Sequence, residues 1–433
     1  MKTWFASTVA AAAMLAAGTA GAAERPEKLE IGITAFLSGP ASVFGVPGRN
    51  AAEMLIEGIN KNGGVDGVPI EATFVDEGAG GNQLLNEYRR LVETQDVDAM
   101  LASISSGNCK KVAPLAEDLE ILNIMWDCGT QVIFEENAYD YVFRTQAHAG
   151  AEMVASVMYL LKTKPDFDTI AVVNQDYAWG RDSWNIFRRT LKALKPDVEV
   201  VAELFPKFGA ADYSTEISRL SALRPDVILS TAWGGDLDTF VRQAANRGLT
   251  RRSTFVLPLA ESSLERLGDT LPEGVIVGGR GDHYFLHPEF KDDPAYRSFV
   301  DAYRERTGEW PIYPVFHMAQ GLNALTKAYE KAIDANDGTW PSTEQVAGQM
   351  EGLTFRGLTN PVTIRKDHQG LEDQLLGTTT SSDEHDFKVL RDIMIFPGEL
   401  VTTPVGKVTA EWVQTLDTDS LEAQGIRTYP GAK

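Results

Sequence analysis

The chain has 433 residues, of which 43% are hydrophobic and 23% are charged. This length is enough for two domains with sizeable hydrophobic cores, and the ordinary composition excludes disordered and fibrous proteins. The formal net charge is −21. The chain therefore lacks the basic surface that nucleic acids and anionic lipids require, and we expect neither as a partner.

Residues 1–23 have the features of a signal peptide. Lys2 supplies a positive charge, Phe5–Ala17 forms a short apolar run, and small residues over Ala20–Ala23 offer cleavage sites. An N-terminal membrane anchor is the alternative, but the run is too short for a good span and no cysteine follows it for lipid attachment. No later stretch is long and apolar enough to cross a bilayer. We therefore expect a soluble, exported, periplasmic protein without stable membrane insertion.

Apolar strands alternate with amphipathic helices along most of the chain. The strands are expected at Leu29–Phe36, Ile70–Asp76, Ala99–Ser103, Leu122–Trp126, Thr169–Asn174, Glu199–Phe205, Val227–Thr231, Thr254–Leu257 and Val275–Gly278. The helices between them are expected at Gly48–Lys61, Gln83–Thr94, Lys110–Leu119, Ala149–Lys162, Gly180–Leu194, Ser214–Leu223 and Asp236–Gly248. Alternation of this kind predicts an α/β protein whose parallel sheets are covered by helices on both faces.

The pattern changes after Val275. A polar, β-like tail over Val362–Thr403 follows three further helices, which we expect at Pro294–Gly308, Val315–Ile333 and Ser342–Glu351. The two halves of the chain resemble each other as series of strands and helices, which predicts two similar lobes. We expect crossings between the lobes near Phe143–Gln146, Val277–His283 and Phe355–Val362. The resulting division is a signal peptide (1–23), lobe 1 (24–144), lobe 2 (145–278), a return to lobe 1 (279–357), and a return to lobe 2 with a C-terminal tail (358–433).

Motifs of common catalytic and cofactor sites are missing from the sequence. No P-loop and no G-x-S-x-G elbow occurs, and Gly78–Gly81 lacks the third glycine of a dinucleotide site. His283 and His287 are four residues apart, but nearby prolines predict a loop rather than a shared helical face, so we expect no metal pair. We therefore predict that the protein is not an enzyme and has no cofactor and no metal. An exported α/β hydrolase is the less favoured alternative.

The segment Ile104–Cys109 joins a predicted strand to a predicted helix. Free backbone N–H groups at a helix start, with the hydroxyls of Ser105 and Ser106 beside them, are suited to bind a carboxylate. The alternative is simple helix capping by Ser106 or Asn108, and the two roles are compatible. We expect the ligand of this protein to touch this loop.

The two cysteines are Cys109 and Cys128. The first is expected at a helix start after one strand, and the second at the end of the next strand, so neighbouring strands would bring them close. An oxidising compartment permits a disulfide between them. Two small buried hydrophobic side chains are the alternative.

The run Leu29–Asp76 resembles the opening of one protein family. Its LSGP loop (Leu37–Pro40), a downstream glycine and the IN-x-x-GGV-x-G turn (Ile59–Gly67) recur in that order in the branched-chain amino-acid type of periplasmic binding protein, the Leu/Ile/Val-binding protein family. Members are extracytoplasmic receptors of ABC importers. The resemblance covers most of the chain from Leu29 to about Gly370. It implies the type I fold, with two Rossmann-like lobes whose parallel-core sheets are joined by a three-strand hinge.

The resemblance also implies roles for residues that follow strands. In the family the Ser105–Ser106 loop and the threonine matching Thr130 hold the ligand's α-carboxylate, while the carbonyl at the position of Cys128 and a glutamate at the position of Glu261 accept from its ammonium group. Trp179 stands where the family has a tyrosine that stacks on the ligand.

Three further positions have two readings each. Asp236 stands where the family often has an aromatic ligand contact, although an aspartate there could simply cap a helix. Phe44 and Tyr313 match aromatic residues that line the family's cleft, although either could belong to a core or a rim.

These matches predict a receptor that captures a small amino acid or related carboxylate and delivers it to the transmembrane subunits of an ABC permease. Trp179 and Asp236 depart from the family pattern and argue for a ligand other than an ordinary branched-chain amino acid. A ligand-sensing receptor of a signalling system is the alternative reading.

Overall fold

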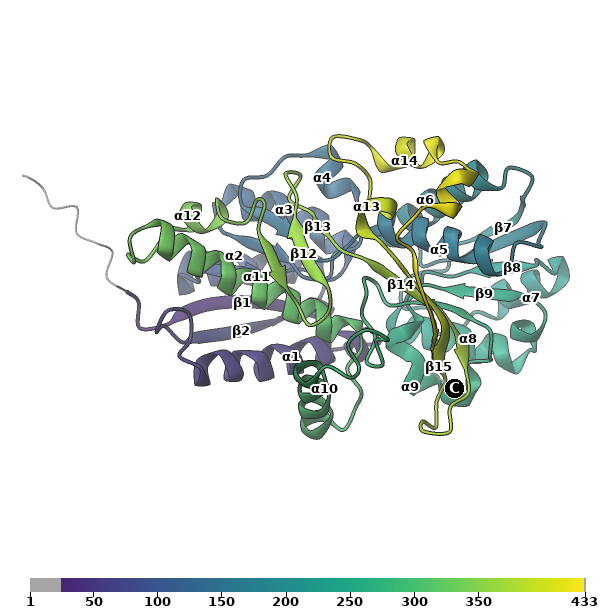
Figure 1. Cartoon of the computed structure of the whole chain (residues 1–433), viewed down its shortest axis with the longest axis horizontal. Coiled ribbons are helices and arrows are strands. Elements are labelled where there is room, and N and C mark those ends of the chain that lie inside the picture. The colour runs from purple at the N-terminus through teal and green to yellow at the C-terminus, as the bar shows by residue number, and fades with distance from the viewer. Residues whose placement is uncertain (1–24, 432–433) are drawn as a thin grey trace, which may run out of the picture.

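The computed structural model describes residues 25–431 and consists of two α/β lobes that lie side by side (Figure 1). The signal peptide expected over residues 1–23 lies outside the described residues. Each lobe is built on its own sheet, and both sheets have a parallel core. The α/β class and the two-lobed organisation predicted from the sequence are therefore confirmed.

The first lobe contains a five-stranded, all-parallel sheet in the order β2-β1-β3-β4-β5. Its strands are β1 (Leu29–Ala35), β2 (Ile70–Asp76), β3 (Ala99–Leu101), β4 (Asn123–Met125) and β5 (Val142–Arg144). The helices that connect them are α1 (Ser42–Lys61), α2 (Gly81–Gln95), α3 (Ser106–Asp118) and α4 (Val132–Glu136), with the short 3₁₀ turn η1 (Glu77–Ala79).

The second lobe contains an eight-stranded sheet in the order β16-β15-β14-β10-β9-β8-β6-β7. Its parallel strands are β6 (Thr169–Val173), β7 (Glu199–Leu204), β8 (Val227–Leu229), β9 (Thr254–Leu257) and β10 (Ile276–Gly278). Three antiparallel strands extend it: β14 (Gln374–Thr380), β15 (Val389–Phe396) and β16 (Arg427–Gly431). Its helices are α5 (Ala149–Thr163), α6 (Ala178–Leu194), α7 (Ser214–Leu223), α8 (Gly234–Asn246) and α9 (Leu264–Leu267), with 3₁₀ turns η2 (Leu249–Arg251), η3 (Ala260–Ser263) and η4 (Gly268–Thr270).

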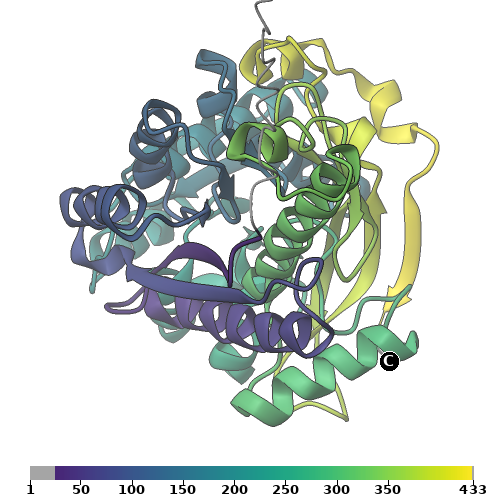
Figure 2. The same cartoon turned by 90° about the vertical axis from the view of Figure 1, so that its left-hand side faces the viewer.

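The remaining elements lie between β10 and β14 and near the C-terminus. The first group comprises α10 (Pro294–Thr307), α11 (Tyr313–Ala335), α12 (Thr343–Ala347) and a small antiparallel sheet of β11 (Thr354–Arg356), β12 (Pro361–Ile364) and β13 (Gly370–Leu371). The second comprises α13 (Gly398–Val401), α14 (Thr409–Trp412), η5 (Val413–Thr415) and η6 (Thr418–Glu422). The long helix α11 packs beside α1 in the first lobe, as the view onto that lobe shows (Figure 2).

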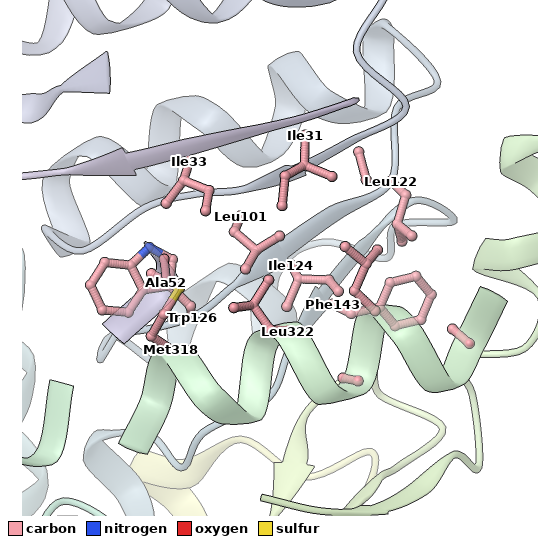
Figure 3. Packing of buried hydrophobic residues seen from close by; sticks show 14 of the residues in the cluster. Ile31, Ile33, Ala52, Leu101, Leu122, Ile124, Trp126, Phe143, Met318 and Leu322 are labelled. Carbon is pink, nitrogen blue, oxygen red and sulfur yellow. The ribbon is translucent and has the colours of Figure 1, made fainter. Parts of the chain in front are cut away.

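The core of the first lobe lies between its sheet and α11 (Figure 3). Ile33 on β1, Leu101 on β3 and Ile124 on β4 share one buried cluster with Leu322 of α11. Burial of each such side chain contributes about 1.5–3 kcal/mol. The helix can approach closely because Gly321 has no side chain: a Cβ there would lie only 3.2 Å from Leu101. This packing fixes α11, whose first residues reach the space between the lobes.

The helix after the LSGP loop begins earlier than the sequence predicted. We expected it to start at Gly48, since a loop rich in serine, glycine and proline precedes that residue. In the structure α1 starts at Ser42 and contains Pro47. The difference matters because it places Phe44 on a helix rather than in a loop.

The chain passes between the lobes three times, and the three segments are hydrogen-bonded to one another. Arg144 N donates to His368 O over 2.9 Å, and Leu375 N donates to Gly281 O over 2.8 Å. The lobe boundaries at residues 144, 278 and 357 stay a prediction. Phe355 and Ile364 belong to the first-lobe cluster, which favours a third boundary later than residue 357.

Candidate ligand-binding site

A cavity lies between the lobes, at the carboxyl ends of the strands of both sheets. Its volume is about 10 Å³, which is room for roughly one water molecule, so a solute can enter only when the lobes move apart. Crevices at this edge of open α/β sheets are where such proteins bind ligands. The lining residues come from α1, from loops after six strands and from the first turns of α3 and α6: Phe44, Ile104, Ser106, Asp127, Gly129, Tyr177, Trp179, Trp233, Leu259 and Arg280.

Four of the ten lining residues are aromatic: Phe44, Tyr177, Trp179 and Trp233. The ring of Phe44 packs edge-on against Trp233 and against Tyr313, with centroids 5.2 Å apart in each pair. Trp179 Nε1 donates to Thr231 O over 2.8 Å, and Trp233 Nε1 donates to the Tyr177 hydroxyl over 2.6 Å. Because these bonds hold both indoles in place, the cavity offers a firm, flat apolar surface to a ligand.

The main polar group in the cavity is the guanidinium of Arg280, which is 6% exposed. Its Nη1 lies 2.9 Å from Asp127 Oδ1, and its Nε lies 3.1 Å from Glu152 Oε1. It also lies over the rings of Trp179 and Tyr313, 5.1 and 5.4 Å from their centroids. Within residues 25–431, Nη2 of Arg280 and Oδ2 of Asp127 have no hydrogen-bond partner. The cavity therefore contains a donor and an acceptor that are both unused.

Burial shifts the titration of this group of charges. It raises the pKa of Asp127 to about 7, against the opposing attraction of Arg280. It likewise raises the pKa of Glu152 to about 7, again against Arg280. Burial alone would lower the pKa of Arg280, but the charges of Glu152 and Asp127 outweigh it and raise the pKa above its ordinary value. One guanidinium thus faces two buried carboxyl groups.

The predicted carboxylate loop is already bonded to a carboxylate of the protein itself. Glu77, buried after β2, accepts from Ile104 N and Asn108 Nδ2 over 2.9 and 3.0 Å, and Ser105 N lies 3.5 Å from it. Burial raises the pKa of Glu77, against the donors that surround it. Sequence reasoning missed this residue. Of the two predicted serines, Ser106 lines the cavity and Ser105 does not.

Cys128 and Thr130 lie beside the cavity rather than on its lining. The carbonyl oxygen of Cys128 accepts from Arg144 Nη1 and Gln146 Nε2, each over 2.9 Å. Thr130 Oγ1 donates to Asp182 Oδ2 over 2.6 Å, a bond that joins the two lobes. Between them, Gly129 does line the cavity.

The cysteines form a disulfide. Cys109 and Cys128 are bonded, with Cα atoms 6.3 Å apart. The bridge joins the start of α3 to the loop after β4. It therefore fixes the positions of Ser106 and Asp127, which belong to these two segments.

The other predicted site residues divide into two groups. Phe44 and Trp179 line the cavity, and Tyr313 packs against both Phe44 and the guanidinium of Arg280. Asp236 lies in a neighbouring groove beyond Trp233, where it accepts from Gln175 Nε2 and Gly209 N over 2.9 and 2.8 Å.

Glu261 is buried but is not on the cavity lining. Its Oε2 accepts from the first N–H of α11, at Tyr313, over 2.8 Å. Within the described part of the chain its Oε1 has no partner, and burial raises its pKa to about 8. The ammonium-binding role predicted for Glu261 stays a prediction.

Sequence reasoning missed seven residues of the lining: Ile104, Asp127, Gly129, Tyr177, Trp233, Leu259 and Arg280. Each lies in the loop after a predicted strand. A rule that counts every such loop as part of the ligand site would therefore have found all of them. Arg280 stands in a Gly-Gly-Arg-Gly run directly after β10, and an arginine among glycines at the end of a buried strand is the signal that could have indicated it.

Comparisons with known proteins identify the family. Residues 28–383 match the family model described as periplasmic binding protein. The leucine-, isoleucine-, valine-, threonine- and alanine-binding protein of Pseudomonas aeruginosa is 23% identical over 344 residues, which cover 79% of this chain and 87% of the relative. Leu/Ile/Val-binding protein homolog 4 of Brucella melitensis is 24% identical over 382 residues, covering 85% and 88%.

Solved structures share the fold. A solute-binding protein of an ABC transporter from Rhodopseudomonas palustris, in complex with 3,4-dihydroxybenzoic acid, superposes with a TM-score of 0.75 at 19% identity, covering 88% of this chain and all of that one. A branched-chain amino acid transporter substrate-binding protein from Streptococcus pneumoniae, in complex with isoleucine, gives 0.67 at 16% identity, covering 81% and 96%. No helix within residues 25–431 combines the length and apolar character needed to cross a membrane. The family match, which extends over most of the chain, shows that the protein belongs to the periplasmic binding protein family.

Proposed function

We propose that the protein is exported to the periplasm, where it serves as the solute-binding receptor of an ABC importer. It would close its lobes around one small ligand and present the closed form to the transmembrane subunits of a permease. The family match, the names of the relatives as amino-acid-binding proteins and the signal-peptide features of residues 1–23 support this role.

The proposed ligand is a small amino acid or a related carboxylate with an apolar or aromatic body. The observation that carries this proposal is the pair of unused groups in the cavity, Arg280 Nη2 and Asp127 Oδ2. A guanidinium N–H is a strong donor to a carboxylate, and a carboxylate oxygen is a strong acceptor from an ammonium group. A zwitterionic amino acid would satisfy both.

In the proposed pose, the ligand carboxylate meets Arg280 and the hydroxyl of Ser106. An ammonium group, where the ligand has one, meets Asp127. The body of the ligand lies against Trp179 and Trp233. Solved structures that share the fold hold benzoates and isoleucine, and aromatic walls suit the apolar bodies of both kinds of ligand.

Contacts between the lobes support a closing motion. Gly235 N, at the start of α8, donates to Pro40 O of the LSGP loop over 3.1 Å, and Thr130 donates to Asp182. Closure removes water from the cavity, and charges attract each other more strongly in a poorly hydrated space.

A thermal-shift screen tests this function. The purified protein is mixed with L-leucine, L-phenylalanine, benzoate, 4-hydroxybenzoate and, as a neutral control, benzyl alcohol. A ligand present at 100 times its Kd should add about 2.7 kcal/mol to the unfolding free energy, so a true ligand will raise Tm clearly while benzyl alcohol will not. If no amino acid and no carboxylate in a wider panel raises Tm, the proposed ligand class is wrong.

A further inference from the structure

Three buried side chains from distant parts of the chain meet at the hinge. His283 lies on the second segment that passes between the lobes, Glu372 lies on the third, and His317 lies on α11. One donor atom of each lies within 4.8 Å of the other two. His283, His317 and Glu372 are 1%, 0% and 3% exposed, in that order. This hinge cluster adjoins the ligand cavity but is not part of its lining.

The ring of His283 has no hydrogen bond to satisfy it. Within residues 25–431, neither of its nitrogens has a partner. Nε2 lies 3.5 Å from Glu372 Oε2, and Nδ1 lies 3.7 Å from Asp282 Oδ1. Buried polar groups in proteins are nearly always hydrogen-bonded or bound to an ion. A buried imidazole between two carboxyl groups, with both nitrogens unused, therefore points to a ligand of the ring.

Negative groups outnumber positive ones around the hinge cluster. Asp127 and Glu152 share the guanidinium of Arg280. In the part of the chain that the structure describes, no lysine or arginine pairs with Asp282 or Glu372, which accept only from neutral donors. These donors are Thr359 and Asn360 for Asp282, and Gln320 and Ala147 for Glu372. A bound cation would balance this buried charge.

The position of His317 fits a metal ligand. Its Nδ1 lies 2.6 Å from Asp127 Oδ1, and metal-binding histidines commonly donate their second nitrogen to a carboxylate, which orients the ring. With Nδ1 donating, the lone pair of Nε2 faces the carbonyl oxygen of Arg280 over 2.7 Å. A proton on Nε2 satisfies this contact, and a metal ion would take the place of that proton.

We infer that His283, His317 and Glu372 bind a divalent transition-metal cation, with zinc as the best match. Two histidines and one glutamate are a common zinc ligand set, and Zn–N and Zn–O bonds of about 2.0–2.2 Å place tetrahedral ligands about 3.3–3.5 Å apart. The separation of His283 Nε2 and Glu372 Oε2 is 3.5 Å. A water molecule would complete the coordination.

Gly281 keeps this space open. A Cβ at this residue would lie 2.7 Å from Glu372 Oε1 and 2.8 Å from His283 Nε2. The residue has a φ of +105°, which favours glycine. Glycine is therefore required here for two reasons: it adopts the positive φ, and it leaves space between two of the metal ligands.

A metal ion here would tie two hinge segments to α11 and would touch the ligand site through Asp127. Its main effect should be to hold these hinge segments in fixed positions. Because Asp127 contacts both His317 and Arg280, removal of the metal should also change the affinity for the solute. The metal site does not depend on the identity of that solute.

Zinc binding by the full-length exported protein, purified without a histidine tag and dialysed against a chelator, tests this inference. Titration of Zn²⁺ against a chromophoric chelator should give one tight site per chain, and Co²⁺ should give the visible d–d bands of a four-coordinate site. His283→Ala should weaken Zn²⁺ binding at least 100-fold. The matched control is His385→Ala, because this histidine packs against Trp310 outside the hinge cluster, and it should bind Zn²⁺ as the wild type does.

Glu372→Gln serves as a second variant if His283→Ala does not fold, since it keeps the size of the side chain. It should lose at least tenfold in Zn²⁺ affinity and should alter the Co²⁺ bands. The inference is overturned if the wild-type protein binds no stoichiometric Zn²⁺, or if Zn²⁺ binding is unchanged in both hinge variants. Neither result would bear on whether the cavity binds an amino acid or a carboxylate.

Discussion

Nη1 of Arg280 lies 2.9 Å from Oδ1 of Asp127, and this ion pair joins a hinge segment that follows the second-lobe sheet to a loop of the first lobe. Both residues also face the cavity with a second polar atom that has no partner within residues 25–431. The pair thus links the relative position of the lobes to the presence of a ligand. Binding and closure are expected to be coupled through it.

Replacement of Asp127 by asparagine should distinguish ligand types. The asparagine keeps the size of the side chain but loses the carboxylate that would accept from an ammonium group. We expect the Kd of an amino acid to rise at least tenfold and the Kd of a carboxylate without an amine to change less than threefold. Isothermal titration calorimetry with L-phenylalanine and 3-phenylpropionate measures both.

The matched comparison is Glu261→Gln, which removes the other buried acid considered for the ammonium group. Glu305→Gln, at an exposed position of α10, is the inert control. If Glu261→Gln weakens the binding of the amino acid more than Asp127→Asn does, Glu261 and not Asp127 binds the ammonium group.

The buried Glu261 should make stability fall as pH rises. Its folded-state pKa is raised to about 8 by burial, above the value of about 4.3 in an unfolded chain. Between these values the folded state holds a proton that the unfolded state releases, so the unfolding free energy decreases with pH by up to about 1.4 kcal/mol per unit. Urea denaturation from pH 5 to pH 8 should show this decrease.

Glu261→Gln removes the titrating group and keeps an acceptor for Tyr313 N. This variant should therefore lose less stability than the wild type between pH 5 and pH 8. Glu305→Gln, at an exposed position of α10, should follow the wild-type curve. Identical slopes for the wild type and Glu261→Gln would show that Glu261 does not titrate in this range.

Loss of the bond between Thr130 and Asp182 should favour the open form. A hydrogen bond to a charged acceptor contributes about 1.5–3 kcal/mol, and this one joins a loop of the first lobe to α6 of the second. We expect Thr130→Val to weaken ligand binding about tenfold while Tm of the free protein changes little. Small-angle X-ray scattering should show a larger radius of gyration for the variant at a subsaturating ligand concentration. In Thr239→Val, which loses a bond within α8 alone, affinity and radius should stay at wild-type values.

Removal of the disulfide should reduce both stability and affinity. A bridge over 19 residues contributes about 3 kcal/mol by the chain-entropy relation. Replacing Cys109 and Cys128 by alanine should therefore lower the unfolding free energy in urea by about this amount. Affinity should also fall, because the bridge fixes the loops that carry Ser106 and Asp127. A reductant should reproduce both effects in the wild type and should leave the alanine variant unchanged.

The sequence predicted the lobes and the edge of the sheets where the cavity lies, because strand–helix alternation and the Leu29–Asp76 motif are local patterns. Phe44, Ser106 and Trp179 line the cavity, and their contact with a ligand stays a prediction. Roles that depend on non-local contacts were not predictable in this way. Glu77 reaches the Ser105 loop from a strand two places away in the sheet.

Long-range contacts likewise explain Arg280 and His283. The guanidinium of Arg280 meets Asp127 and Glu152, which are more than a hundred residues earlier in the chain. In the sequence, His283 could be considered as a metal ligand only together with His287, four residues away. In the structure, the possible partner ligands of His283 are His317 and Glu372. No spacing in the sequence indicates such a cluster, since only the folded hinge brings it together.

The most direct test of the account is calorimetric titration of the best ligand from the screen into the wild type, Arg280→Gln and Arg266→Gln. Arg266 pairs with Asp238 away from the cavity and controls for loss of a partly buried guanidinium. We expect one ligand per chain, a Kd at least 100-fold weaker in Arg280→Gln, and no change in Arg266→Gln. Equal affinity in all three proteins would contradict the assignment of the cavity between the lobes as the ligand site.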